Sequence, residues 1–317
     1  MRGSWARAEA LIDEGGPRGR ATRAPTRSGG FGGNPEMYNR YARSDAGERL
    51  VMIGNAGSTG DGITMMIDAG AALWDTIGTA LHCPVVRGAT YQGPTHDASL
   101  MPYLWLDREG RRFTDEACGF DWGIAGDIVA GLPGACSWTI LDTSQIEHVT
   151  TDPQILAENP NLTKIPGDLA ISTQKEDLAV YTADTLEELA ARIGLDPDQL
   201  VATVEEYNGY CRAGFDPKFR KGPEFLLPLV KAPYYAFKLE PGILITMGGV
   251  RIDDRMRVVD ARGRVIPGLY SVGCDAGGLF GDSYSLVVPG TANGFAYTSG
   301  WLAADDLAEA LEPAATA

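Results

Sequence analysis

The sequence offers little material for a disulfide framework or a metal centre. Its five cysteines (Cys83, Cys118, Cys136, Cys211 and Cys274) have no CxxC spacing, and their odd number leaves one without a partner. It has three histidines, and none belongs to an HExxH-like pair. We therefore predict neither a disulfide scaffold nor a metal site.

Positive charge is scarce as well. The 27 Lys and Arg residues are outnumbered by 42 Asp and Glu residues, which gives a net charge of −15. This balance argues against nucleic acid or an anionic membrane as a partner. No run of 18 apolar residues occurs, so no membrane span is expected. We expect up to two domains. The expected partner is a small-molecule substrate, and the expected compartment is by default the cytoplasm.

The first 28 residues differ from the rest of the chain. Residues 1–28 are rich in Arg, contain no Lys and show little apolar periodicity. They lack the apolar core of a signal peptide, and their composition predicts poor order. From Ser28 the sequence changes abruptly to SGGFGGNPEM.

Local signals predict several elements in the middle of the chain. Thr185 and Glu188 form a capping box for a helix that Gly194 ends. Asp196-Pro197 starts the next helix, whose predicted core residues are Leu200, Val204, Tyr207 and Cys211. The stretch WLDREGRRFTDEA (105–117) predicts two short strands around a turn at Gly110.

The segment GNAGSTGDGITMMIDAGAAL (54–73) predicts a helix capped by Ser58 or Thr59, with Asp61 in its first turn. Asp61 has two interpretations. It could complement the helix dipole, or it could bind a hydroxyl-bearing ligand, for which the flanking Gly60 and Gly62 leave room.

Glycine is abundant, with 40 residues, and is concentrated in GGLFGDSYSLVVPGTANGFAYTSG (277–300). Before this stretch, MRVVDARGRVI predicts a hairpin and GLYSVG a buried strand. After it, residues 291–311 predict a helix with Pro289 and Gly290 at its start. Its free N–H groups suit an electron-rich atom, although tight helix packing without a ligand also explains the small residues.

The order of five motifs, SGGFGGNPEM, GNAGSTGDGITMMIDAGAAL, REGRRFTDE, ITMGGVRID and IPGLYSVGCDAGG, resembles FAD-dependent fumarate reductase/succinate dehydrogenase-type flavoproteins. The likeness is to the soluble fumarate and urocanate reductase branch and covers residues 28–317. It implies a fold class of α/β combined with α+β. In this fold a Rossmann-like FAD-binding domain, occupying 29–72 and 236–317, is interrupted by a fumarate-reductase-type capping domain at 73–235.

The resemblance also implies which residues hold FAD. Gly60 and Asp61 would lie near the cofactor, Met247-Gly248 beside the isoalloxazine ring, and Gly273, Cys274 and Asp275 near the ribityl chain. The family has Glu where Cys274 stands, and Asp275 is a candidate substitute. The start of the last helix would face the pyrimidine end of the ring, at Pro289, Gly290, Thr291 and Ala292.

Two departures from the family qualify this interpretation. No GxGxxG turn, which holds the FAD pyrophosphate, occurs in the chain, and RATRAPTRS replaces the apolar strand expected before GGFGGN. We therefore expect an N-terminally truncated chain, whose export signal, if the family member has one, would lie on the missing part. The cationic residues that bind a dicarboxylate are also absent at Gly93-Pro94-Thr95, 142–146, 242–245 and around Val287.

The function predicted is an FAD-dependent oxidoreductase that reduces or desaturates a C=C/C–C bond of a substrate other than a dicarboxylate, by hydride transfer at flavin N5. Tyr284 is the candidate proton donor and Glu116 a candidate proton relay, with Asp282 and His96 as weaker candidates. A buried structural role for Tyr284, and a surface or capping role for Glu116, remain open. The alternatives are an inactive fragment, or a binding module that needs a partner; the residues specify no electron donor or acceptor.

Overall fold

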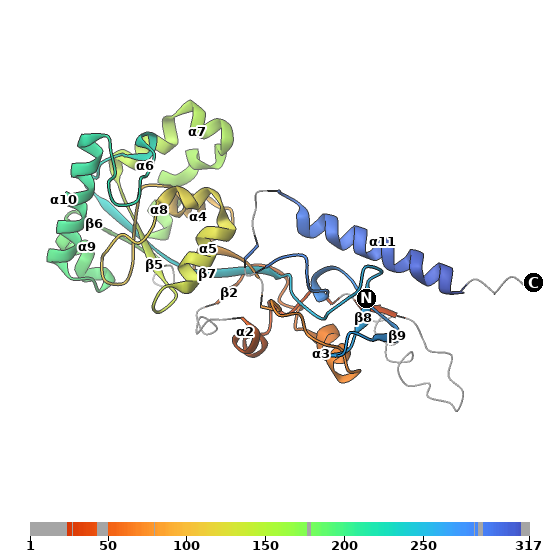
Figure 1. The fold of residues 1–317 in the computed structure, drawn as a ribbon. Helices are drawn as coiled ribbons and strands as arrows, with labels where there is room; N and C mark the ends of the chain where they lie inside the picture. The colour runs from red at the N-terminus through yellow and green to blue at the C-terminus, as the bar shows by residue number, and fades with distance from the viewer. Residues whose placement is uncertain are drawn as a thin grey trace, which may run out of the picture. The chain divides into compact units, whose positions relative to one another are not determined.

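The computed structural model describes residues 24–26, 28–42, 50–78, 80–175, 179–281, 283–284 and 288–311. They form two compact units (Figure 1). Unit 1 contains the described residues of 1–43, 54–81 and 243–317, and unit 2 those of 44–53 and 82–242. Most of the segment predicted to be poorly ordered, 1–28, lies outside the described residues. The assignment of FAD-binding and capping roles to the predicted ranges stays a prediction.

Unit 2 is built on a six-stranded sheet in which the long strand β7 (Tyr234–Thr246) pairs with several others. The strands that pair with it are β2 (Val51–Met52), β3 (Ala80–Val86), β5 (Ser137–Asp142) and β6 (Val180–Ala183), and β4 (Leu104–Leu106) pairs with β5. The pairs β4–β5, β5–β7 and β6–β7 are antiparallel. Strands β3 and β7 continue into unit 1.

Helices surround this sheet. They are α4 (Pro94–Ser99), α5 (Trp122–Gly131), α6 (Thr143–Thr151), α7 (Pro153–Glu158), α8 (Ile165–Ser172), α9 (Leu186–Ile193) and α10 (Pro197–Ala213). Short 3-10 helices lie between them: η1 (Glu116–Phe120), η2 (Pro160–Lys164) and η3 (Pro223–Phe225).

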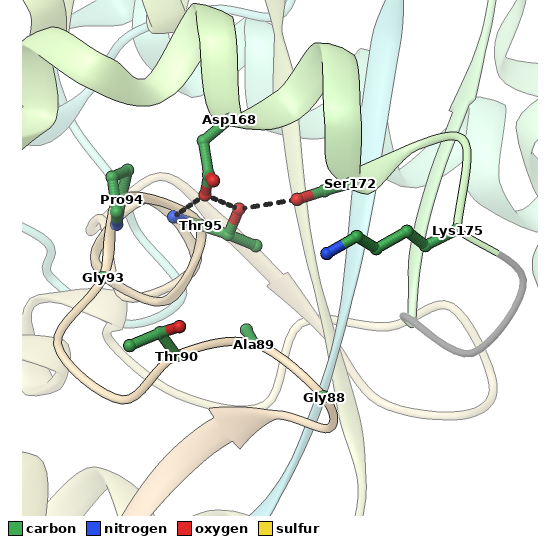
Figure 2. Close-up of a pocket in the computed structure, with 9 residues that line it drawn as sticks. All are labelled: Gly88, Ala89, Thr90, Gly93, Pro94, Thr95, Asp168, Ser172 and Lys175. Atoms are coloured by element: carbon green, nitrogen blue, oxygen red, sulfur yellow. Dashed lines mark hydrogen bonds between the residues drawn. The ribbon is translucent and has the colours of Figure 1, made fainter.

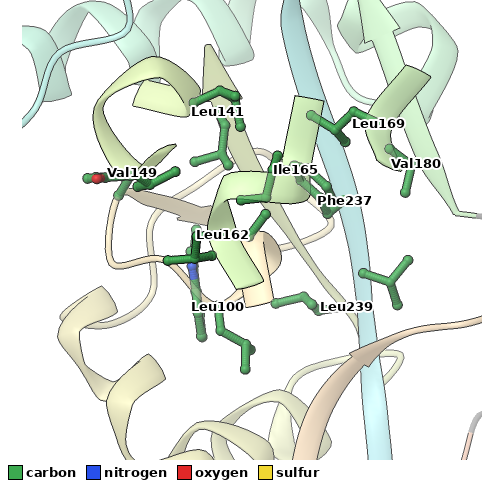
Figure 3. Packing of buried hydrophobic residues seen from close by; sticks show 14 of the residues in the cluster. Leu100, Leu141, Val149, Leu162, Ile165, Leu169, Val180, Phe237 and Leu239 are labelled. Carbon is green, nitrogen blue, oxygen red and sulfur yellow. The ribbon is translucent and has the colours of Figure 1, made fainter. Parts of the chain in front are cut away.

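The sheet of unit 2 is buried on both faces because side chains alternate along each strand. Leu104, Leu106 and Ala236 pack with α9 and α10 in one core cluster. Trp105 and Phe237, their neighbours in sequence, face the other cluster. Figure 3 shows part of this second cluster, where Leu162, Ile165 and Leu169 from η2 and α8 lie beside β7.

The helices predicted from local signals form as expected. Thr185 accepts a hydrogen bond from the Glu188 N–H at the start of α9, and Gly194 ends α9 in the left-handed conformation at φ 73°. Asp196 caps α10, whose Leu200, Val204 and Tyr207 are buried while Cys211 packs at the margin of the cluster. The predicted second strand after Gly110 does not form. Arg112 and Glu116 turn into a buried ion-pair network there, and η1 follows.

Unit 1 contains a three-stranded sheet in the order β1-β9-β8, made of β1 (Ala24–Thr26), β9 (Val265–Ser271) and β8 (Arg257–Val259). The predicted hairpin is present: β8 and β9 are antiparallel and Gly263 turns between them at φ 73°. The expectation that no strand precedes GGFGGN is wrong, because Ala24–Thr26 pairs in parallel with Leu269–Ser271. Backbone hydrogen bonding does not require the apolar side chains that the prediction looked for.

The remaining elements of unit 1 are α2 (Pro35–Tyr41), α3 (Asp61–Asp68), η4 (Gly273–Asp275) and α11 (Thr291–Leu311). Helix α11 covers the range predicted for it. Its Ala303 packs with Met256, Tyr270 and Val272, and Asp306 accepts a hydrogen bond of 2.7 Å from the Tyr270 hydroxyl. None of the helices in the described ranges is both long and apolar enough to cross a membrane.

Candidate functional site

Three residues predicted to bind a flavin and the predicted proton donor come together in unit 1. Met247, Cys274, Tyr284 and Ala292 belong to one apolar cluster, which also contains Leu81, Leu244, Ile245, Phe280 and Phe295. Cys274 Sγ lies 3.6 Å from Met247 Sδ. Leu81, the end of β7 with Met247, and residues between Cys274 and Phe295 thus form one apolar wall.

Tyr284 lies inside this cluster, with 3% of its surface exposed. Its ring stacks in a tilted arrangement on Phe280, with 4.5 Å between centroids. The Ala292 N–H donates to its hydroxyl at 3.3 Å, so the phenol oxygen is at the N-terminus of α11. The hydroxyl keeps its own proton as a donor. Asp282 and Val287 lie outside the described residues.

Asp275 fixes the backbone around it. Its carboxylate accepts hydrogen bonds from the Ser28 N–H at 2.5 Å and the Gly30 N–H at 2.9 Å, and it is fully buried. Ser28 Oγ in turn accepts from the Gly62 N–H at 3.1 Å. Asp275 therefore ties three distant segments of unit 1 together, a role that its position next to Cys274 did not predict.

The helix α3 begins differently from the prediction. Gly60, not Ser58 or Thr59, is its N-cap, with φ at 84° and no side-chain capping bond. A Cβ on Gly60 would lie 2.3 Å from Met37 Sδ, and one on Gly62 would lie 2.8 Å from the Asp275 carboxylate. The space beside these glycines is therefore filled by the protein. Asp61 itself is exposed and accepts a bond of 3.0 Å from the Thr59 hydroxyl.

Close contacts within the chain also explain why glycine stands at positions 248 and 273. A Cβ on Gly248 would lie 2.3 Å from the carbonyl oxygen of Ile77. Gly273 has φ at 60° and its N–H donates to Ser299 Oγ of α11 at 3.0 Å. These contacts set the close packing of strand, loop and helix that shapes the wall.

The start of α11 differs from these tightly packed positions. A Cβ on Gly290 (φ 85°) or on Gly294 would meet no atom within 4 Å. Pro289 is exposed, Thr291 and Ala292 are partly exposed, and Val288 is 66% exposed. A helix N-terminus with open space beside it and an apolar wall behind it suits the ring of a flavin. The residues present thus fit the ring end of FAD, while no GxGxxG turn for its pyrophosphate occurs in the sequence.

Glu116 occupies a closed ion-pair network in unit 2. Its carboxylate accepts from Arg112 Nε at 2.7 Å and Nη2 at 2.8 Å, and it pairs with Lys221 Nζ at 3.0 Å. Arg112 also donates to Asp216 at 2.8 Å, and all four side chains are fully buried. Burial lowers the pKa of Lys221, and the neighbouring Glu116 counteracts this. Glu116 is therefore neither a surface residue nor a helix cap.

His96 lies in a second buried group of unit 2. Its Nε2 is 3.7 Å from Cys83 Sγ and its Nδ1 is 3.2 Å from the Asp97 carboxylate. Although Cys, His and Asp are arranged in a row, burial raises the pKa of Cys83 to about 12. The thiol is thus protonated at neutral pH and is no nucleophile.

A small polar pocket of about 80 Å³ lies next to this group, at Gly93-Pro94-Thr95 (Figure 2). Asp168 accepts from the N–H of Thr95 at 3.0 Å and from its hydroxyl, and Thr95 Oγ1 lies 3.1 Å from Ser172 Oγ. Lys175 is the one cationic residue among the described residues that line it. Asp142 lies in the range 142–146, where the resemblance implied a cationic residue. The side chain of Asp142 caps α6.

A much larger pocket, of about 450 Å³, was not predicted from the sequence. Its lining residues all belong to unit 2: Met101, Pro102, Tyr103, Phe120, His148, Asp152, Gln154, Ile155, Glu158, Asn159, Leu162, Glu224 and Phe225. Most of its surface is apolar. No short motif in the sequence indicated this pocket, because four segments that are far apart in the sequence supply its walls.

Four of the five described arginines in the C-terminal part of unit 1 form ion pairs with acidic residues. Arg251 pairs with Asp75, Arg255 with Asp306, Arg257 with Asp253, and Arg264 with Asp260. In each of these pairs, at least one of the two side chains is exposed at the surface.

Comparisons with known proteins agree with this geometry. A family described as an FAD binding domain matches residues 6–287. The chain belongs to this family. Vinyl phenol reductase of Lactiplantibacillus plantarum is 32% identical over 286 residues, which cover 86% of this chain and 57% of that protein. The predicted resemblance to fumarate reductase-type flavoproteins is confirmed.

Two solved structures have a similar fold. A flavocytochrome c3 fumarate reductase in the open conformation shares 28% identity at a TM-score of 0.60, over 90% of this chain and 46% of that one. The 3-ketosteroid Δ1-dehydrogenase of Sterolibacterium denitrificans, solved with 1,4-androstadiene-3,17-dione, shares 26% identity at a TM-score of 0.68, over 89% and 52%. The chain thus spans about half the length of these relatives. The family implies FAD as cofactor.

Proposed function

We propose that the chain forms part of an FAD-dependent oxidoreductase that reduces or desaturates a carbon–carbon bond. The observation that carries this proposal is the apolar wall of unit 1, where Met247, Cys274, Tyr284 and Ala292 meet at the open N-terminus of α11. The relatives named above, a vinyl phenol reductase and a ketosteroid dehydrogenase, support it. When bound, FAD supplies hydride chemistry at N5. The predicted Rossmann-like FAD-binding domain, interrupted by a capping domain, is part of the same proposal.

The chain's own residues have separate roles in this proposal. Met247 and Cys274 form an apolar surface that excludes water from one side of the ring. The N-terminus of α11, which begins at Thr291, stabilises negative charge on the ring through the helix dipole. Gly290 leaves space for the ring to approach the backbone. Tyr284 holds a proton at its hydroxyl, close to the same helix end, and donates it to the substrate carbon.

Glu116 has a different role in unit 2. Its two oxygens are taken up by Arg112, Lys221 and the Trp105 N–H. A carboxylate held in this way positions its neighbours rather than moving protons. We therefore assign the proton-relay function to Tyr284 alone and a positioning function to Glu116.

The substrate is an alkene or ketone other than a dicarboxylate. Binding two carboxylates requires cationic donors in good geometry. Four of the five arginines between Met247 and Cys274 are paired with acids. The name of vinyl phenol reductase points to an uncharged aromatic alkene as the type of substrate.

Retention of FAD tests the proposal. The purified chain is incubated with excess FAD and desalted, and its visible absorption spectrum is recorded. We expect retained flavin bands. The variant Ala292→Phe, which fills the space at the start of α11, should lower the retained flavin at least about tenfold. Ala308→Phe, an exposed position of the same helix, is the matched control. A colourless wild-type chain with an intact circular dichroism spectrum contradicts the proposal.

A further inference from the structure

We propose that the 450 Å³ pocket of unit 2 is a binding site for a small uncharged aromatic or alicyclic molecule, and that it disfavours a carboxylate. The inference goes beyond the proposed function, because it adds a ligand site in unit 2 that is separate from the apolar wall of unit 1. Pockets of about 300–1,000 Å³ that are mostly apolar are typical of small-molecule sites. The pocket is formed within unit 2, so its geometry does not depend on how the units are arranged.

Aromatic side chains form the walls. Phe120 and Phe225 face each other with ring centroids 5.5 Å apart at 52°, and Tyr103 lies in the same lining. Phe120 is 60% exposed although it is large and apolar. Exposure of such a side chain at the mouth of a pocket indicates a surface that a ligand covers. Flat rings offer stacking and edge contacts to a conjugated ligand.

The ion-pair network around Glu116 fixes these walls. Glu116 and Phe120 are the first and last residues of the single 3-10 helix η1. Lys221, which pairs with Glu116, also donates to the carbonyl oxygen of Tyr103. The Tyr207 hydroxyl donates to the carbonyl oxygen of Phe225 at 3.3 Å. The backbones of Tyr103 and Phe225 thus accept hydrogen bonds from this buried polar group, and Phe120 is connected to it through η1.

Charge at the pocket decides which ligands enter. Asp152, Glu158 and Glu224 line it, and its described lining residues include no Lys or Arg. Asp152 is further stabilised as a carboxylate, because the Ile155 and Gln154 N–H groups of α7 lower its pKa. His148 is the one titratable base in the lining. A ligand carboxylate would meet negative charge without a cationic partner.

A matched pair of ligands separates shape from charge. The probes are 4-vinylphenol, which is uncharged at neutral pH, and 4-vinylbenzoate, which has nearly the same shape and a negative charge. Calorimetric titration of the 317-residue chain measures binding with and without FAD. We expect 4-vinylphenol to bind in both conditions and 4-vinylbenzoate to bind at least about tenfold more weakly. Absence of 4-vinylphenol binding overturns the inference.

Substitutions of the wall residues test where the ligand binds. Phe120→Ala should weaken 4-vinylphenol binding about tenfold, because it removes a stacking surface. Phe215→Ala is the matched control, since Phe215 is also an exposed residue of unit 2, at 54%, but does not line the pocket. Both positions are exposed, so both variants should fold. Equal binding by wild type and Phe120→Ala overturns the placement of the ligand.

Charge reversal tests the selectivity. Glu224→Lys should raise the affinity for 4-vinylbenzoate about fivefold and leave that for 4-vinylphenol unchanged. Glu205→Lys, at an exposed position of α10 outside the pocket, should change neither. An unchanged preference in Glu224→Lys overturns the role of the acidic lining. Loss of FAD retention with intact binding contradicts the proposed function alone, whereas FAD retention without binding contradicts this inference alone.

Discussion

At the scale of single residues, the network around Glu116 shows how burial changes the meaning of a carboxylate. The sequence RRFTDEACGF suggested a proton relay. In the folded chain Glu116 lies between Arg112 and Lys221, with all three side chains fully buried. A buried charge is tolerated only when it is paired and hydrogen-bonded. The guanidinium of Arg112 also lies over the rings of Tyr207 and Phe219.

We predict that Glu116→Gln destabilises the chain by about 3 kcal/mol, because it leaves Arg112 and Lys221 buried with an uncompensated charge. Urea denaturation followed by circular dichroism measures the change. The matched control is Glu205→Gln on the exposed surface of α10, which should stay within about 0.5 kcal/mol of wild type. Unchanged stability together with lost activity would instead support a proton relay.

Residue-level prediction from the sequence named residues without their contacts. The resemblance implied that Met247, Cys274 and Ala292 lie along one flavin; the structure brings the three into one apolar cluster, and their contact with FAD stays a prediction. Gly60 and Gly62 were expected to leave room for a ligand. Met37 and Asp275 fill that room instead, and nothing in the neighbouring residues indicates this, because Asp275 is more than 200 positions away.

At the scale of elements, the predictions with local signals were the accurate ones. Helices α9 and α10 have caps at Thr185 and Asp196, and the β8–β9 hairpin has its turn glycine at Gly263. These signals lie within the element and act through backbone hydrogen bonds. Strand β1 and the missing strand after Gly110 depend on long-range pairing and on burial of charge, which no local pattern encodes.

Helix α11 is attached to the β8–β9 sheet through Asp306. Its carboxylate accepts from Arg255 at 2.8 Å and from the Tyr270 hydroxyl at 2.7 Å. Both hydrogen bonds lower the pKa of Asp306 from its ordinary value of 3.8, and the bond from Arg255 has the larger effect. A carboxyl whose pKa is lower in the folded chain stabilises the fold fully above its ordinary pKa. That stabilisation is lost as the pH falls through the folded-state value.

We therefore predict that Asp306→Asn lowers the free energy of unfolding by about 1 kcal/mol at pH 7. The difference from wild type should shrink below pH 3.8, because Asp306 of the wild type becomes protonated there. Urea denaturation at a series of pH values measures it. Asp305→Asn, the exposed neighbour, should show no such dependence. A difference that is constant with pH would mean that packing, not charge, is lost.

At the scale of the whole molecule, a cofactor held by unit 1 should stabilise that unit and not unit 2. Unit 2 has two extensive core clusters, one on each face of its sheet. The described core of unit 1 includes the clusters around Val272 and Met247 and the buried Phe31, Ile63 and Met66. A ligand that binds only the folded state stabilises it by an amount that rises with the logarithm of its concentration over Kd.

Hydrogen exchange should therefore respond to FAD in unit 1 and not in unit 2. At a concentration of FAD one hundred times its Kd, the stabilisation is about 2.7 kcal/mol. This should slow exchange through opening of unit 1 about a hundredfold. We expect protection in peptides that cover 247–249, 273–276 and 291–294, measured by mass spectrometry with and without FAD. Peptides from α9 and α10 should exchange equally in both conditions and serve as the internal control. Protection confined to unit 2 would place the cofactor away from the apolar wall. A bound ligand slows exchange only of those amides that become exposed after the ligand has dissociated.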